Sequence, residues 1–247
     1  MRKYALLLVV MATSLFLFGC AEKNPASPDM AVTDLAATGA EKSLTEAGAA
    51  NATYEIIVEN LTPATGPGAS QPFSPPILAT HRGNMHVFEA GKYASSALSM
   101  VAEDAIGGPL LEMLNGSDRV HGVAAGDGVV FPGSETRLEI EARPGFWSLS
   151  LVFMLVNTND AFGGLDGVKL PTHGEMTYMV HAWDAGSELN TELMTDIPGP
   201  CCGSPGMGTD EEKVISHHMG IMGTGDLAAA TYGWEGPVAR VTVRRID

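Results

Sequence analysis

The chain has 247 residues, of which 45% are hydrophobic and 17% are charged, and its formal net charge is −15. An acidic protein of this kind repels phosphate backbones, so nucleic acid is not an expected partner. The length suits one large β-sandwich or barrel together with a leader and a linker. Cys201 and Cys202 are adjacent and cannot staple distant segments, so the fold must rest on its own hydrophobic core.

The first twenty residues predict export. Arg2 and Lys3 give a short positive region, and Ala5 to Phe18 is an apolar run of about fourteen residues. A membrane-spanning helix needs about 20, so this run is typical of a secretory signal over residues 1–19. It ends in Leu17-Phe18-Gly19-Cys20, which resembles the lipobox of bacterial lipoproteins. The resemblance implies lipidation of Cys20 and attachment to a membrane through acyl chains; an ordinary signal with an incidental cysteine is the alternative.

Residues 20–51 are predicted to be a flexible tether. From Glu22 onward this stretch is rich in Ala, Ser, Thr, Pro and Glu, has no aromatic residue, and cannot bury enough apolar surface to offset the entropy of ordering it. Ala21, directly after Cys20, is not the Asp that retains enteric lipoproteins at the inner membrane, which favours the outer membrane or the cell surface.

Residues 52–247 are predicted to form one domain. A strand is expected at Thr53–Asn60, followed by a Pro-, Gly- and Ser-rich loop at Thr62–Pro76. Apolar residues at helical spacing predict two short helices, at Ala94–Glu103 and Leu110–Leu114.

The second half of the domain reads mostly as strands. The strict alternation of Thr136–Ala142 predicts a half-buried strand, and the apolar run Phe146–Val156 predicts a strand buried on both faces. Further elements are strands at Met176–Trp183, Lys213–Ser216 and Val238–Arg244, and a long polar loop at Leu189–Gly208. Short strands with Gly- and Pro-rich connections predict an all-β fold, an antiparallel β-sandwich with a few short helices in the connections.

Two acidic segments each follow a strong strand. Asn157-Thr158-Asn159-Asp160 comes after the buried strand, and Trp183-Asp184-Ala185-Gly186-Ser187-Glu188 comes after the next one. If these strands are neighbours, both segments emerge at one end of the sheet. Carboxylate and amide oxygens suit calcium, which takes six to eight oxygen ligands. The alternative is that these residues only form Asx-turns.

A second candidate site is rich in soft ligands. His217, His218 and Met219 lie downstream of Cys201 and Cys202, and such side chains select copper or zinc. The spacing fits no common zinc pattern, however, and adjacent histidines on a strand point to opposite faces. A weaker candidate pocket consists of Pro72–Pro76 with His81, for which a rigid connection and a hydrogen-bonded histidine are the simpler explanation.

Several segments in order also carry a family resemblance. They are Glu59–Pro63, Gln71–Pro76, Ala79–His81, Ala102–Asp104, Asn157–Phe162, Trp183–Glu188 and Ile197–Pro200, with His218, Gly220-Ile221 and Pro237–Ala239. From about Tyr54 to Arg244 the chain resembles the spondin N-terminal domain in its bacterial form. The resemblance implies a β-sandwich similar to the membrane-targeting domains of synaptotagmin type, in a family whose animal members are extracellular matrix proteins that hold calcium and engage cell-surface receptors.

The resemblance also implies site residues. The family's metal position matches Asn159-Asp160 and Asp184, Glu188 stands where an acidic residue is frequent, and Glu141 is a plausible further ligand. The chain departs from the animal pattern at Asn157–Ala161 and lacks the animal cysteine framework, so the fold carries over better than the receptor-binding role. The expected function is a surface-anchored, calcium-binding adhesion module with a protein, matrix or polysaccharide partner, and not an enzyme.

Overall fold

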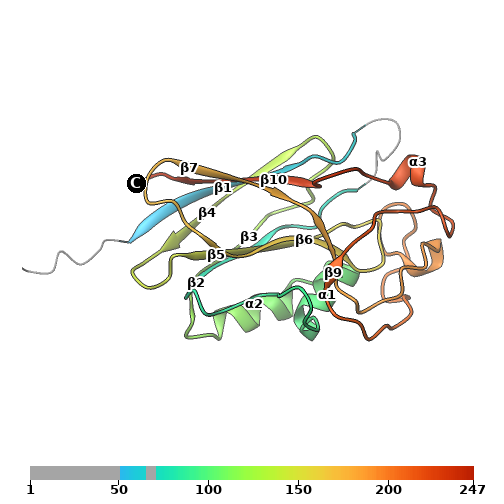
Figure 1. Ribbon diagram of the computed structural model, residues 1–247, viewed down its shortest axis with the longest axis horizontal. Coiled ribbons are helices and arrows are strands. Elements are labelled where there is room, and N and C mark those ends of the chain that lie inside the picture. Colours follow the sequence, from blue (N-terminus) through green and yellow to red (C-terminus); the bar gives the residue numbers. More distant parts are fainter. Residues whose placement is uncertain (1–50, 65–70) are drawn as a thin grey trace, which may run out of the picture. The chain divides into compact units, whose positions relative to one another are not determined.

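The computed structural model describes residues 51–64 and 71–247. The predicted signal peptide, Cys20 with its predicted lipidation, and the predicted tether up to residue 50 lie outside the described residues. Within them the strands form two antiparallel sheets (Figure 1). The predicted antiparallel β-sandwich is therefore confirmed.

The first sheet has four strands. Its order is β4 (Glu135–Ala142), β1 (Ala52–Asn60), β10 (Ala239–Arg245) and β7 (Glu175–Val180). The second sheet has six strands, in the order β3 (Val120–Ala125), β2 (Ile77–His81), β5 (Ser148–Met154), β6 (Ala161–Lys169), β8 (Ala182–Asp184) and β9 (Ser216–His217).

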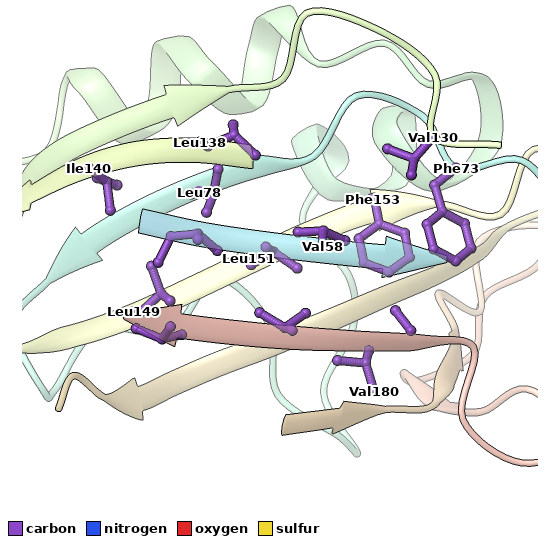
Figure 2. Close-up of a cluster of buried hydrophobic side chains, with 14 of the residues drawn as sticks. Val58, Phe73, Leu78, Val130, Leu138, Ile140, Leu149, Leu151, Phe153 and Val180 are labelled. Carbon is purple, nitrogen blue, oxygen red and sulfur yellow. The ribbon is translucent and has the colours of Figure 1, made fainter. Parts of the chain in front are cut away.

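The core lies between the two sheets. Alternate residues of β1 are buried, as the pleat of a strand with one covered face requires. Figure 2 shows side chains of the two sheets meeting, with Leu138 and Ile140 of β4 near Leu78 of β2. Phe73 and Phe153 stack with ring centroids 4.2 Å apart. Burying such residues removes apolar surface from water, which stabilises the fold by roughly 25 cal/mol per Å².

The helices lie on the outer face of the six-stranded sheet. Helix α1 (Ser96–Asp104) begins where the Ser95 hydroxyl accepts the Leu98 N–H, and it ends at Ala105 in a left-handed conformation. Helix α2 (Gly108–Asn115) follows at once. Both bury their apolar residues in a second cluster that includes Val152 and Phe162. A 3-10 turn, η1 (Met194–Asp196), and a short helix, α3 (Ala229–Tyr232), lie in the later loops.

The structure corrects the expected elements in two places. Strands β2, β3 and β6 were not predicted, and β6 begins at Ala161, directly after the acidic segment Asn157–Asp160. Its glycines are used for packing, because a β-carbon on Gly163 would lie 2.3 Å from the Phe153 ring. The single strand expected at Met176–Trp183 is two strands, since the chain leaves the four-stranded sheet at Val180 and joins the six-stranded sheet at Ala182.

Candidate functional site

Asp160 is the centre of the acidic site. It lies immediately before β6, and its backbone carbonyl accepts the Ala185 N–H at 3.2 Å, so the pairing of β6 with β8 fixes its position. Its side chain is fully buried. One carboxylate oxygen, Oδ2, accepts the backbone N–H groups of Ser187 and Glu188 at 2.8 and 3.1 Å. The other, Oδ1, is buried and has no hydrogen-bond partner among the described residues.

Glu188 brings a second carboxylate to the same place. Only 7% of its surface is exposed, and a β-carbon on Gly208 would lie 1.9 Å from its Oε1 atom, so the side chain lies against the Gly208 backbone. No hydrogen bond to its carboxylate is found within residues 51–64 and 71–247. Burial, together with the charges of Glu103 and Asp160, raises the pKa of Glu188 to about 8.

The pKa of Asp160 is raised as well. Burial, and next the charge of Asp184, raise the pKa of Asp160 to about 7, although the amides of Glu188 and Ser187 act in the opposite direction. Glu103, at the end of α1, contributes to the raised pKa of both buried carboxyls. Glu103 was not predicted as a site residue, although it lies in segment Ala102–Asp104 of the family resemblance, because only the docking of α1 on the sheet brings its charge close to theirs.

Asp184 is held by its own loop. Its Oδ1 atom accepts the Gly186 N–H at 2.7 Å, an Asx-turn, and its Oδ2 atom accepts the Asn190 side-chain amide at 2.6 Å. The turn function considered for this residue is therefore present, while its charge still acts on Asp160. The structure brings Asp160, Asp184 and Glu188 to one end of the β6–β8 pair.

Glu141 lies elsewhere. It is exposed on β4 in the four-stranded sheet, where it pairs with Thr53, whereas the other predicted ligands belong to the six-stranded sheet and its loops. The alternating pattern of the sequence placed Glu141 on the polar face of a strand, but it did not indicate which sheet that strand would join.

The neighbouring loops are tied to the site by Asn159 and Glu192. Asn159 Oδ1 accepts the Glu192 N–H at 3.3 Å. The buried Glu192 carboxylate accepts the N–H groups of Met222 and Thr224, each at 2.6 Å. Burial raises the pKa of Glu192, but the hydrogen bonds from Met222 and Thr224 outweigh it, so the pKa lies below the ordinary value. Glu192 thus joins segment 189–196 to segment 221–226.

The oxygen-rich site fits the chemistry of calcium. A hard cation would satisfy the buried Asp160 oxygen that has no donor and the second buried carboxylate, that of Glu188. The positive charge of the cation would also lower the raised pKa values of both carboxyl groups. Within the described ranges, no three His, Cys, Asp or Glu side chains are already grouped as a metal cage. Asp160 and Glu188 are the residues that would hold the ion.

The soft-ligand residues are divided among different partners. Cys201 and Cys202 form a disulfide with each other, so they present no thiolate. His217 stacks on Trp183 at 4.4 Å between ring centroids, and His218 stacks on Trp234 at 5.5 Å. Both ring nitrogens of His218 are in hydrogen bonds, to Asn190 Oδ1 and from the Gly220 N–H. Burial lowers the pKa of His218, which favours the neutral ring.

Met219 and the two histidines do share a pocket of about 290 Å³ with His181 and Trp234. The Met219 side chain is exposed. His181 was not singled out from the sequence, and it reaches the pocket because the chain crosses between the sheets at this residue.

A Ser–His–Asp group links three strands of the six-stranded sheet. His81 Nε2 lies 2.7 Å from Ser150 Oγ, and Ser150 donates to Asp166 Oδ1 at 2.9 Å. Asp166 also binds the ring of His86 and the Val87 N–H. The hydrogen bonds of Ser150 with His81 and Asp166 join β2, β5 and β6. They lie inside the protein, since His81 and Ser150 are at most 1% exposed. The hydrogen-bonded histidine expected at position 81 is confirmed.

Comparison with known proteins defines the class of protein. The family model of the spondin N-terminal domain, Spondin_N, matches residues 52–196, from β1 to η1. The matched range contains Asp160, Asp184 and Glu188 with their loops. No curated protein matches the chain at a significant level.

The chain therefore belongs to the spondin N-terminal domain family, whose domain is typically extracellular. Strands β9 and β10 lie beyond the matched range, yet β10 completes the four-stranded sheet between β1 and β7. In the described part of the chain no helix combines the length and hydrophobicity required to cross a membrane.

Proposed function

We propose that this protein is an exported binding module whose acidic loops hold a calcium ion between Asp160 and Glu188. The observation that carries the proposal is the buried Asp160 Oδ1 atom, which lacks a donor beside a second buried carboxylate. Two such groups repel each other, so at neutral pH the site favours either protons or a cation. An oxygen-only ligand set favours calcium over soft metals.

In this proposal calcium supplies positive charge and the loops supply geometry. The amides of Ser187 and Glu188 orient Asp160 through Oδ2, which leaves Oδ1 for the ion. Asp184 and Glu103 add negative charge around the site without being required as direct ligands. The ion would join the end of β5–β6 to the loop after β8, so that the surface of segment 184–212 becomes more rigid and suited to binding another molecule.

Thermal unfolding of the metal-stripped protein, with and without calcium, tests the proposal. Calcium that binds only the folded state raises stability by RT ln(1 + [L]/Kd), about 2.7 kcal/mol at a hundredfold excess over Kd. We expect a rise of several degrees that magnesium does not reproduce and that Asp160→Asn abolishes. Glu141→Gln is the matched control, since it removes an equal charge from the other sheet. An equal rise in the Asp160→Asn variant would refute the site.

We also propose that the module is attached to the cell envelope through Cys20 and functions in adhesion rather than catalysis. Mass spectrometry of the mature N-terminus tests the anchor, which requires a chain that starts at Cys20 and carries acyl groups. A mature chain that starts elsewhere, or an unmodified Cys20, would refute the anchor.

The rival function, a soft-metal protein or enzyme using His217, His218, Met219, Cys201 and Cys202, has less support. The disulfide removes both thiolates, and the hydrogen bonds of His218 occupy both of its nitrogens. Copper titration distinguishes the two proposals, because tight stoichiometric uptake that is lost in His218→Ala would favour the rival.

A further inference from the structure

Four of the five cations that make no ion pair among the described residues are gathered at one end of this acidic domain. The described residues contain ten Lys and Arg against 24 Asp and Glu. Five of the ten make ion pairs: Arg137, Lys213, Arg240, Arg244 and Arg245. Of the five that make none within the described ranges, Lys92 lies apart, and the other four are Arg82, Arg119, Arg143 and Lys169.

Strand register brings these four together. His81, Ser148 and Lys169 are direct cross-strand partners on β2, β5 and β6, so Arg82 and Lys169 both lie at this end of the sheet. The Arg82 N–H donates to the Arg119 carbonyl at 2.9 Å. Arg143 is in the turn between β4 and β5. In Figure 1 this turn lies at the left end of the domain, and the orange loops after β8, which carry the acidic site, lie at the right.

Phe146 holds two of the guanidiniums in place. The Arg82 and Arg143 Cζ atoms lie 4.5 and 4.6 Å from the centroid of its ring, which is itself buried. Each contact is a cation–π interaction, so the two like charges stay close without a carboxylate between them. Because they are already fixed, they lose little conformational entropy when they bind an anion.

Lys169 extends the same surface. Its Nζ atom lies 3.5 Å from the Ser148 hydroxyl, and a β-carbon on Gly83 would lie 3.2 Å from it. The ammonium is therefore beside the segment that follows Arg82. The acids that border the surface in sequence, Asp118 and Glu141, make no ion pair with any described residue. All four cations are exposed.

We propose that Arg82, Arg119, Arg143 and Lys169 form a binding surface for an acidic polysaccharide that bears sulfate or carboxylate groups. Four cations at the ends of β2, β3 and β6 and in the β4–β5 turn match an extended polymer with repeated anionic groups. Arg binds such groups through a planar fork and Lys binds them as a point charge. The proposal names a partner class for the binding module and deepens that role, but it does not depend on calcium at the opposite end.

The surface is less suited to the other common polyanions. Among the described residues, none of the exposed large apolar side chains belongs to segments 82–84, 117–121, 143–147 or 169–173. A loop that inserts into lipid would carry such side chains. Single-stranded nucleic acid would need exposed aromatic rings for stacking, and Phe146 is buried.

The test is titration of the full chain with heparin, a sulfated probe, and with alginate, a carboxylated probe, at low and high NaCl. We expect binding to at least one polymer that weakens steadily as salt rises, since counterions are released. The variant Arg82→Gln/Arg143→Gln should weaken that binding by ~10-fold or more at low salt. Arg137→Gln/Arg240→Gln removes the same charge from ion-paired positions and should leave it nearly unchanged.

Three outcomes would overturn the inference: no binding of either polymer, equal loss in both double variants, or binding to phosphatidylglycerol vesicles without binding to the polymers. The variant Arg82→Lys/Arg143→Lys, which keeps the charges, should recover part of the affinity; failure to do so while the fold is intact would also contradict it. Asp160→Asn should not change polymer binding, so a failure of the calcium proposal and a failure of this one are separable.

Discussion

The backbone and side chain of Glu188 act on Asp160 in opposite directions. The Glu188 N–H donates to Asp160 Oδ2 at 3.1 Å and favours the charged carboxylate, whereas the two side-chain charges oppose each other and help to raise the pKa of Glu188 to about 8. The loop after β8 therefore orients Asp160 but leaves the pair with excess negative charge. This balance makes the site sensitive to protons and cations.

Asp160→Asn should change how the stability of the metal-free protein depends on pH. Because the pKa of Asp160 is raised to about 7, this residue holds a proton in the folded protein that the unfolded chain has released, and its contribution to the free energy of unfolding falls as pH rises from about 4 to about 7. The loss is on the order of 4 kcal/mol for a shift of about three pKa units. The variant lacks this loss, so at pH 8 it should be as stable as the wild type or more so.

Urea unfolding of both proteins across this pH range measures the difference. Glu141→Gln serves as the control and should follow the wild type. If the difference between Asp160→Asn and the wild type does not vary with pH, then Asp160 is not protonated in the folded state and the account of the site is wrong.

Gly208→Ala should weaken the calcium response without changing the backbone. The new methyl carbon would lie 1.9 Å from Glu188 Oε1, so the flexible carboxylate must move. Gly208 does not need a left-handed conformation. The calcium-induced rise in melting temperature, measured by calorimetry, should therefore shrink. Gly128→Ala is the matched control, because a β-carbon there meets no atom within 4 Å. Equal calcium responses in the two variants would exclude Glu188 as a ligand.

Glu192→Gln should loosen the loop that it holds. The charged carboxylate accepts the Met222 and Thr224 N–H groups, and replacing charged hydrogen bonds by neutral ones should cost about 1–3 kcal/mol. Since the pKa of Glu192 is lowered, its contribution is present above the ordinary pKa of glutamate and is lost as pH falls through the folded-state value. Urea unfolding should show a deficit at neutral pH that disappears in acid.

Glu212→Gln provides the comparison for Glu192→Gln, because Glu212 is exposed. Hydrogen exchange of segment 221–226 gives an independent measure, and faster exchange is expected only in the Glu192 variant. Unchanged exchange there would show that other contacts hold the loop.

The double variant Cys201→Ser/Cys202→Ser should lose little stability. The disulfide joins neighbouring residues, so it restricts a very small loop of the unfolded chain and contributes about 1 kcal/mol in the chain-entropy model. Thermal unfolding should show a small decrease, and reduction of the wild type should have a similar effect. A large decrease would indicate that the disulfide holds the packing around Ile197 and Ile221.

Local patterns were sufficient for much of the fold. The alternation of β1 and β4, the apolar run of β5 and the spacing of α1 are properties of short segments, and each corresponds to an observed element. Strand β2 was missed because it has only five residues and ends in Thr80-His81, so it lacks the long apolar run that marks β5. Strand β6 was missed because Gly163 and Gly164, which make room for Phe153 and Phe88, are typical of loops in a sequence. No periodicity within these segments reports such neighbours.

The sequence by itself determined the class of fold, through patterns within short segments, and it offered Asp160, Asp184 and Glu188 as candidate site residues through the family resemblance of segments 157–162 and 183–188. The strands before the two acidic segments are not neighbours as supposed, because β6 lies between β5 and β8 and itself pairs with β8 beside Asp160, so the tertiary structure decided where the acidic segments meet. Only the tertiary structure decided that Glu103 adds its charge to that site, that Glu141 lies on the other sheet, and that Arg82, Arg143 and Lys169 share one surface. Those relationships join segments far apart in sequence through strand pairing and helix docking, and their electrostatic effects depend on distance and burial, which no local pattern encodes.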